Sequence, residues 1–126
     1  MPRVLIVDDS PVIRSAIKIY LQPVGCDVVD AATGERALQI LRLVSIQLVI
    51  ADISMPGMTG LGLLRAIRAD ERPEIARLHV ILLTGERAES LEAKALEAGA
   101  TAFLRKPVSS NGLVDRVRTL LGATSP

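Results

Sequence analysis

Five polar residues in this 126-residue sequence each come at the end of a short apolar run. They are three carboxylates, one hydroxyl and one amine: Asp8, Asp9, Asp52, Thr84 and Lys106. Hard carboxylate oxygens that leave room for water are the ligands that Mg²⁺ prefers. A cation, an ammonium group, a hydroxyl donor and a free carboxylate together suit a phosphoryl group in transfer. If the fold brings these residues together, they favour Mg²⁺-dependent phosphoryl transfer.

Gathering three carboxylates at one place also predicts a bound cation. Two carboxylates about 4 Å apart repel each other by roughly 4 kcal/mol at an effective dielectric constant of about 20. A whole domain is stable by only about 5–15 kcal/mol, so this repulsion is a large fraction of the total. A divalent cation would relieve it, and the ammonium group of Lys106 offers a further positive charge.

The elements that would position these residues alternate between strand-like and helical patterns. We predict strands over 3–7, 27–31, 47–51, 79–83 and 101–105. The first, third and fourth runs are continuously apolar and rich in Val, Ile and Leu, as strands covered on both faces are. A helical pattern follows each run. The repeated strand and helix predict one α/β domain with a parallel sheet and right-handed crossovers.

Capping residues and apolar spacing mark where the helices begin. The expected starts are Ser10 with Pro11, Thr33, Gly60, Ala88, and Ser109 or Ser110. The helix over 88–98 has a largely alanine apolar face and ends near Gly99. Because alanine buries little apolar area, we expect this helix to be the least firmly anchored.

The strand ends explain why the polar residues matter jointly. Carboxyl ends of parallel strands meet at one edge of an open α/β sheet, where ligands bind. Each residue alone has a simpler interpretation, such as an acid pair that favours a helix N-terminus or a solvated lysine before a turn. Four strand ends that each supply one part of the same site are far less expected by accident.

Composition excludes several classes of protein. The net charge is +1 without a long basic run, and aromatic residues make up 2%, so we expect no direct nucleic-acid binding. No apolar run approaches a membrane span, and no signal peptide is recognisable. Cys26 is alone and has no neighbours at metal-ligand spacing. We therefore expect a cytoplasmic protein with one domain over 1–122 and a polar tail, or the start of a linker, over 123–126.

Four segments carry a resemblance to a known family. In order, "LIVDDS", "ADISMPGMTG", "LLTGE" and "FLRKP" resemble the receiver domain of bacterial two-component response regulators. The resemblance spans nearly the whole chain. It implies a flavodoxin-like fold with five parallel strands in the order 2-1-3-4-5.

The resemblance also implies a role for each site residue. Asp52 corresponds to the phosphoacceptor, which would take a phosphoryl group from a phosphohistidine as an acyl phosphate. The implied Mg²⁺ ligands are Asp8, Asp9, Asp52 and the backbone carbonyl of Ser54. The implied phosphoryl-binding and switch residues are Thr84, Lys106 and Phe103. The implied supporting residues are Pro56, Gly60, Gly85, Glu86 and Pro107.

Partners follow from the same resemblance. A sensor histidine kinase or a histidine phosphotransfer protein would donate the phosphoryl group. A downstream protein would bind the surface of the helix over 88–98, the strand over 101–105 and the last helix. A second copy of the chain would be another partner, in a dimer that depends on phosphorylation. The domain would phosphorylate and dephosphorylate itself and turn over no external substrate.

The sequence departs from the family at three positions. Ser54 stands two residues after Asp52, where the chemotaxis member has asparagine, and Glu86 stands two residues after Thr84. Both positions flank the path of the hydrolytic water in the family, so they bear on the lifetime of the phosphoryl group. Phe103 replaces a tyrosine that is common there, and it cannot donate a hydroxyl hydrogen bond.

Other classes of protein remain as alternatives. A haloacid-dehalogenase-like Mg²⁺ phosphatase needs Asp-x-Asp after the first strand, whereas this chain has Asp8-Asp9-Ser10. A nucleotide- or flavin-binding protein needs a glycine-rich first loop, which is absent here. A receiver that docks partners without phosphorylation is a third alternative. A fourth alternative is the N-terminal receiver of a longer regulator with DNA-binding or enzymatic output.

Overall fold

A five-stranded parallel sheet forms the centre of the computed structural model, which describes residues 1–85, 89–106 and 109–124. The strands are β1 (Arg3–Val7), β2 (Asp27–Ala31), β3 (Leu48–Asp52), β4 (His79–Thr84) and β5 (Ala102–Arg105). Their order in the sheet is β2-β1-β3-β4-β5, and every pairing is parallel. The sheet and its strand order confirm the predicted fold class.

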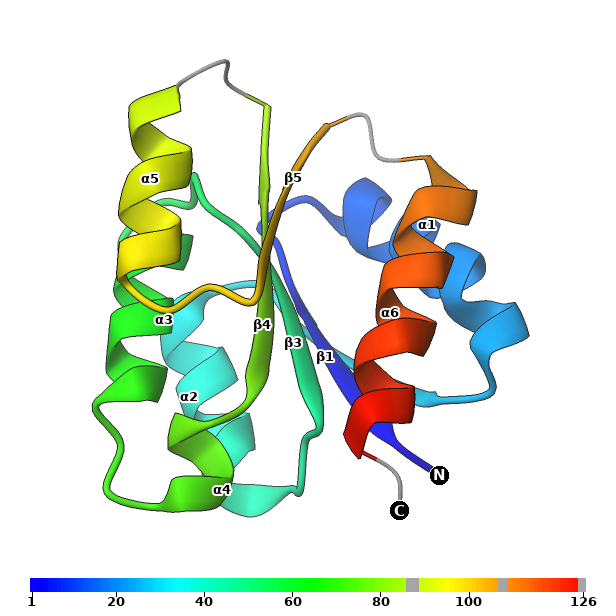
Figure 1. The fold of residues 1–126 in the computed structure, drawn as a ribbon, viewed down its shortest axis with the longest axis horizontal. Coiled ribbons are helices and arrows are strands. Elements are labelled where there is room, and N and C mark those ends of the chain that lie inside the picture. The colour runs from blue at the N-terminus through cyan, green and yellow to red at the C-terminus, as the bar shows by residue number, and fades with distance from the viewer. Residues whose placement is uncertain (86–88, 107–108, 125–126) are drawn as a thin grey trace.

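Helices cover both faces of the sheet (Figure 1). The structure has α1 (Pro11–Leu21), η1 (Gln22–Val24), α2 (Gly34–Leu43), α3 (Gly60–Arg68), α4 (Pro73–Ala76), α5 (Glu89–Glu97) and α6 (Ser110–Thr124). Helices α2, α3 and α5 lie on one face, and α1 and α6 lie on the other. The sheet is therefore doubly wound, and both of its faces are buried.

Side-chain alternation along the strands produces one apolar core on each face. On β1, Leu5 and Val7 belong to the core under α2, α3 and α5, whereas Val4 and Ile6 belong to the core under α1 and α6. All four side chains are at most 1% exposed. Because neither face is in water, the strand has no polar alternation, which is the continuous apolar pattern seen in the sequence.

The predicted caps are present at three helices. The Ser10 hydroxyl accepts from the Ile13 amide, with Pro11 in the first helical position, and the Thr33 hydroxyl accepts from the Arg36 amide. At α6 the Ser109 hydroxyl accepts from the Gly112 amide, so Ser109 caps a helix that begins at Ser110. Each hydroxyl satisfies a backbone N–H that the first helical turn leaves without a partner.

Several details differ from the sequence-based prediction. Helix α3 begins at Gly60, as predicted, but its cap, Thr59, was not named in the prediction. The short helices η1 and α4 were not predicted, although the Pro73-Glu74 start of α4 is a recognisable helix signal. Helix α6 continues to Thr124, two residues into the segment assigned to the polar tail.

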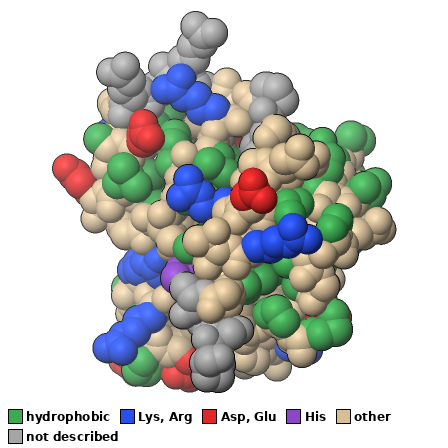
Figure 2. Space-filling model, turned by 45° about the vertical axis from the view of Figure 1, so that its right-hand side comes forward, with side chains coloured by type: hydrophobic (Ala, Val, Ile, Leu, Met, Phe, Trp, Pro, Cys, Tyr) green, Lys and Arg blue, Asp and Glu red, His purple; other side chains and the backbone are tan. Residues whose placement is uncertain are grey.

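The surface agrees with a chain of nearly balanced charge. On the face in Figure 2, the described Lys and Arg side chains are interspersed with acidic, apolar and other side chains rather than joined in one continuous patch. Among the residues that the structure describes, no helix has the length and apolar character needed to cross a membrane.

Candidate functional site

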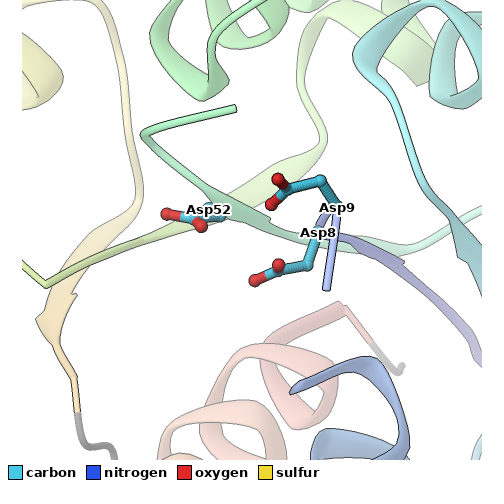
Figure 3. A group of neighbouring side chains, drawn as sticks. All are labelled: Asp8, Asp9 and Asp52. Carbon is cyan, nitrogen blue, oxygen red and sulfur yellow. The ribbon is translucent and has the colours of Figure 1, made fainter. Parts of the chain in front are cut away.

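The three predicted carboxylates meet at the carboxyl ends of β1 and β3. Asp8 and Asp9 follow β1, Asp52 is the last residue of β3, and these two strands are neighbours in the sheet. One carboxylate oxygen from each lies within 4.8 Å of the others. Figure 3 shows the three side chains gathered at this edge, with Asp52 opposite the other two. The sequence prediction of an acidic cluster is confirmed.

Lys106 lies against two of these carboxylates. Its Nζ is 3.0 Å from Oδ2 of Asp52 and 3.4 Å from Oδ2 of Asp8. Its backbone amide donates to the carbonyl of Thr84 at 2.7 Å, which fixes the start of the β5–α6 connection to the end of β4. The lysine is therefore held at both ends, and its ammonium group is directed into the acidic cluster.

Burial has the largest effect on the ionisation of Asp8 in this cluster. Burial raises the pKa of Asp8, and the Asp52 carboxylate raises it further, against the Ser10 amide and the charge of Lys106. Burial alone would lower the pKa of Lys106, but its bond to Asp52 and its attraction to Asp8 outweigh that effect and raise the pKa. The lysine stays charged while Asp8 still resists ionisation, so the site favours a further positive charge.

The loop after Asp52 is shaped by close packing. The Ile53 amide donates to the carbonyl of Leu83 on β4 at 2.8 Å, and the Ser54 amide donates to Oδ1 of Asp52 at 3.2 Å. Met55 is buried in the core, and Pro56 is exposed. Gly57 has a φ of 72°, which with the preceding proline is typical of a type II turn. The loop is thus fixed at its start, with its tip exposed.

A glycine is required at position 60 because α3 begins very close to the end of β3. A Cβ at this position would lie 2.7 Å from Cα of Ile53 and 2.8 Å from the carbonyl carbon of Asp52. The Gly60 amide also donates to the carbonyl of Ile53 at 3.0 Å. Only a residue without a side chain lets the helix start this close to Asp52. Gly60 therefore has a structural reason that supports its predicted place in the site.

Thr84 and Phe103 lie on the side of Asp52 that faces β4 and β5, opposite β1. Asp52 pairs with Leu83 on β4, and Thr84 is the next residue and is 0% exposed. Phe103 pairs with Leu82 and is half-buried against the core under α2, α3 and α5. Thr84 therefore lies on β4, next to the strand of Asp52, and Phe103 lies on β5, one strand further. Both are on the side of α5.

The remaining supporting residues divide into two groups. Gly85 is exposed, and a Cβ there would meet no described atom within 4 Å, so packing does not demand glycine. Glu86 and Pro107 lie outside the described residues. The roles of these three positions stay predictions.

Two cavities border the described chain. One of about 550 Å³ lies beside the acceptor loop, between residues that include Ser54, Met55 and Leu91 of α5. Another of about 750 Å³ lies at the start of β4, around Ile46, Arg72 and Leu78, and contains none of the predicted site residues. The three carboxylates of the acidic cluster line neither of these cavities.

Sequence reasoning missed three residues around the cluster. Gly57 provides the left-handed residue of the acceptor loop, and the "PG" pair was a readable signal for it. Arg14 of α1 donates to the backbone carbonyl of Asp8 and to Oδ2 of Asp30. The only local signal for the latter pair was an acid within the "DVVDA" strand, because the contact depends on how α1 packs against the sheet.

Comparisons with known proteins agree with this geometry. The response regulator receiver domain family matches residues 4–118. The chemotaxis protein CheY of Pseudomonas aeruginosa is 34% identical over 119 residues, which cover 94% of this chain and 94% of that protein. The solved structure of a response regulator receiver protein from Pseudomonas putida is 37% identical, with a TM-score of 0.86 over 94% of this chain and 96% of the other.

Longer regulators are similar over part of their length. The transcriptional regulatory protein AruR of Pseudomonas aeruginosa is 38% identical over 126 residues, which cover 96% of this chain and 50% of that protein. The aerobic respiration control protein ArcA of Escherichia coli is also 38% identical, over 98% of this chain and 50% of its own length. This chain spans about half of each regulator. Fold, site and relatives together show that the chain belongs to the receiver domain family of response regulators.

Proposed function

We propose that this receiver domain accepts a phosphoryl group on Asp52 from the phosphohistidine of a sensor histidine kinase or a histidine phosphotransfer protein. The observation that carries the proposal is that Asp52 lies close to both the β1 carboxylates and Lys106. A carboxylate oxygen of Asp52 would attack phosphorus as the bond to the histidine nitrogen breaks. The imidazole would keep the bonding electrons and the aspartate would become an acyl phosphate.

Magnesium fits the donor set of this site. Three carboxylate oxygens within 4.8 Å of one another are hard ligands of the kind that Mg²⁺ prefers. Burial raises the pKa of Asp8, and a bound cation would favour the charged form of this carboxylate. Asp8, Asp9 and Asp52 would hold the ion, with the backbone carbonyl of Ser54 as a further ligand. When bound, the ion would neutralise negative charge on the phosphoryl oxygens.

The residues of this chain would bind and hold the phosphoryl group. Lys106 already pairs with Asp52, and it would pair with a phosphoryl oxygen after transfer. Thr84 would donate its hydroxyl toward the same group, and the Phe103 ring would then change position. This change would alter the surface formed by α5, β5 and α6 for a downstream protein or for a second copy of the chain.

The extent of the functional unit is also a proposal. We assign the receiver to residues 1–122 of a cytoplasmic signalling protein that turns over no external substrate. The chain matches 94% of the chemotaxis relative, so receivers of this length are among its relatives. The half-length matches to AruR and ArcA support the alternative of an N-terminal receiver with a separate output domain.

Intact-mass spectrometry tests the acceptor directly. The wild-type protein, incubated with Mg²⁺ and acetyl phosphate or phosphoramidate, should gain one phosphoryl group, and beryllofluoride should bind at the same residue. Asp52→Asn should gain nothing. Asp115→Asn, which changes an exposed aspartate on α6, should behave as the wild type does. An unchanged wild-type mass with both donors, or equal labelling of Asp52→Asn, rejects the assignment.

A further inference from the structure

Arg14 links the edge strand of the sheet to the first residue of the acidic cluster. Its side chain is 17% exposed, and its Nε is 2.9 Å from Oδ2 of Asp30 on β2. Its Nη1 donates to the backbone carbonyl of Asp8. Lys18, one helical turn later, lies 3.2 Å from the other oxygen of Asp30. The guanidinium thus has one anchor on β2 and one contact at the end of β1.

The carbonyl that Arg14 contacts belongs to the peptide between Asp8 and Asp9. Asp8 is 1% exposed, and a buried carbonyl that leaves the sheet needs a donor. The amide of Asp8 is already bound by the carbonyl of Ala31 at 3.1 Å. With its amide and carbonyl both bound, this stretch of backbone has one orientation. That orientation sets the direction in which the exposed side chain of Asp9 leaves the chain.

We propose that Arg14, held by Asp30, is a positioning residue that orients the Asp8–Asp9 peptide and so places the Asp9 carboxylate for cation binding. The proposal rests on the proposed function in that the cation is the Mg²⁺ of the phosphoryl-transfer site. Burial would raise the pKa of Asp30, but hydrogen bonds from Lys18 and Arg14 outweigh it and hold the pKa below its ordinary value. Asp30 is therefore a charged and fixed anchor at neutral pH.

A positioning role and a purely electrostatic role of Arg14 predict opposite changes in Mg²⁺ affinity when the residue is replaced. Removing a positive charge near an acidic cluster strengthens the attraction of Mg²⁺ if charge is all that matters. Removing the residue that orients a ligand weakens metal binding, by about 10-fold to 100-fold for groups that support metal ligands elsewhere. The sign of the change therefore distinguishes the two roles.

The test measures Mg²⁺ affinity of the unphosphorylated protein by calorimetric or NMR titration, beside urea unfolding of each variant. Arg14→Met should weaken Mg²⁺ binding by about 10-fold. Arg14→Lys keeps the charge but not the planar double donor, and it should weaken binding as well. Asp30→Asn should weaken binding by a smaller factor. Lys18→Met is the matched control, because it removes a neighbouring charge without a bond to Asp8, and it should not weaken binding.

Unchanged or tighter Mg²⁺ binding in a folded Arg14→Met protein overturns the proposal. Should Arg14→Met fail to fold, Asp30→Asn decides, and unchanged binding there overturns the proposal equally. The titration requires no phosphoryl transfer, so it stands apart from the acceptor assignment. A second readout is the Mg²⁺ concentration for half-maximal phosphorylation by acetyl phosphate, which should rise about 10-fold in Arg14→Met while the maximal rate changes less.

Discussion

The two sides of Asp52 are built differently. On the β1 side, all four polar groups of Asp8 are bound, by Ala31, Ser10, Arg14 and Lys106. On the β4 side, α5 buries only Ala95 among its described side chains, residues 90–97. A cavity of about 550 Å³ is lined by Leu91 of α5 and by residues of the loop after Asp52. The polar groups of Asp8 are therefore all held in place, whereas α5 is packed loosely.

Helix α5 is nevertheless fixed at one end. Gly99 has a φ of 101°, and the amides of Gly99 and Ala100 donate to Leu96 and Ala95 in a Schellman ending. The guanidinium of Arg68 donates twice to the Gly99 carbonyl. A helix held at its C-terminal end and weakly packed along its length can tilt with little loss of buried area. In the proposed function, the β1 side would hold the cation and the β4 side would carry the signal.

The largest expected effect compares one leucine from each side. Leu21 of α1 is 1% exposed, whereas Leu91 of α5 is half-buried. Leu21→Ala should lower the free energy of unfolding by about 2–5 kcal/mol, as buried leucines do. Leu91→Ala should lower it by about 1 kcal/mol, because less apolar area leaves the core. Urea unfolding measures both free energies, and equal losses would show that α1 and α5 are anchored equally firmly.

The next comparison uses two glycines next to the site. Gly60→Ala forces a Cβ against the backbone of Ile53 and Asp52, and it should destabilise the fold by about 1–3 kcal/mol. It should also slow labelling by acetyl phosphate, because Asp52 moves. Gly85→Ala meets open space and should change stability by at most about 0.5 kcal/mol. If both variants unfolded at the same urea concentration, the tight approach of α3 would not constrain Asp52.

A smaller effect concerns charge on the fixed side. Burial and the Asp52 carboxylate raise the pKa of Asp8, so the folded state binds its proton more tightly than the unfolded state does. That contribution is present below the unfolded pKa of about 3.8 and is lost as the pH rises through the raised folded value. Without Mg²⁺, Asp8→Asn should therefore melt a few degrees above the wild type at pH 7. The gap should close as the pH falls toward 4, and a wild type that melts higher at pH 7 would contradict the raised pKa of Asp8.

Sequence patterns predicted the five strands and most of the acidic cluster, because these features depend on residues that are close in sequence. Apolar runs fixed the five strands to within one residue at each end, because buried parallel strands cannot alternate in polarity. The acidic cluster and its lysine were predictable because the carboxyl ends of parallel strands meet at one edge of the sheet. These residues are Asp8, Asp9, Asp52 and Lys106. The short helix α4 was missed because four residues give no periodicity. The Arg14–Asp30 contact was missed because helix packing, and not spacing in sequence, brings the two residues together.

The measurement that tests the two-sided account most directly is an amide NMR comparison with and without beryllofluoride, with both samples at the same saturating Mg²⁺ concentration. Thr84 and Phe103 lie on the loosely packed side, and one charge-assisted hydrogen bond of about 1.5–3 kcal/mol shifts a two-state population more than about tenfold. Chemical shifts should change at Asp52, at Thr84 and across α5 and β5, while the amides of α1 and β2 keep their positions. Thr84→Ala should still bind beryllofluoride and lose the changes in α5 and β5. Changes confined to the Asp52 site, or larger in α1 and β2 than in α5, would contradict the account.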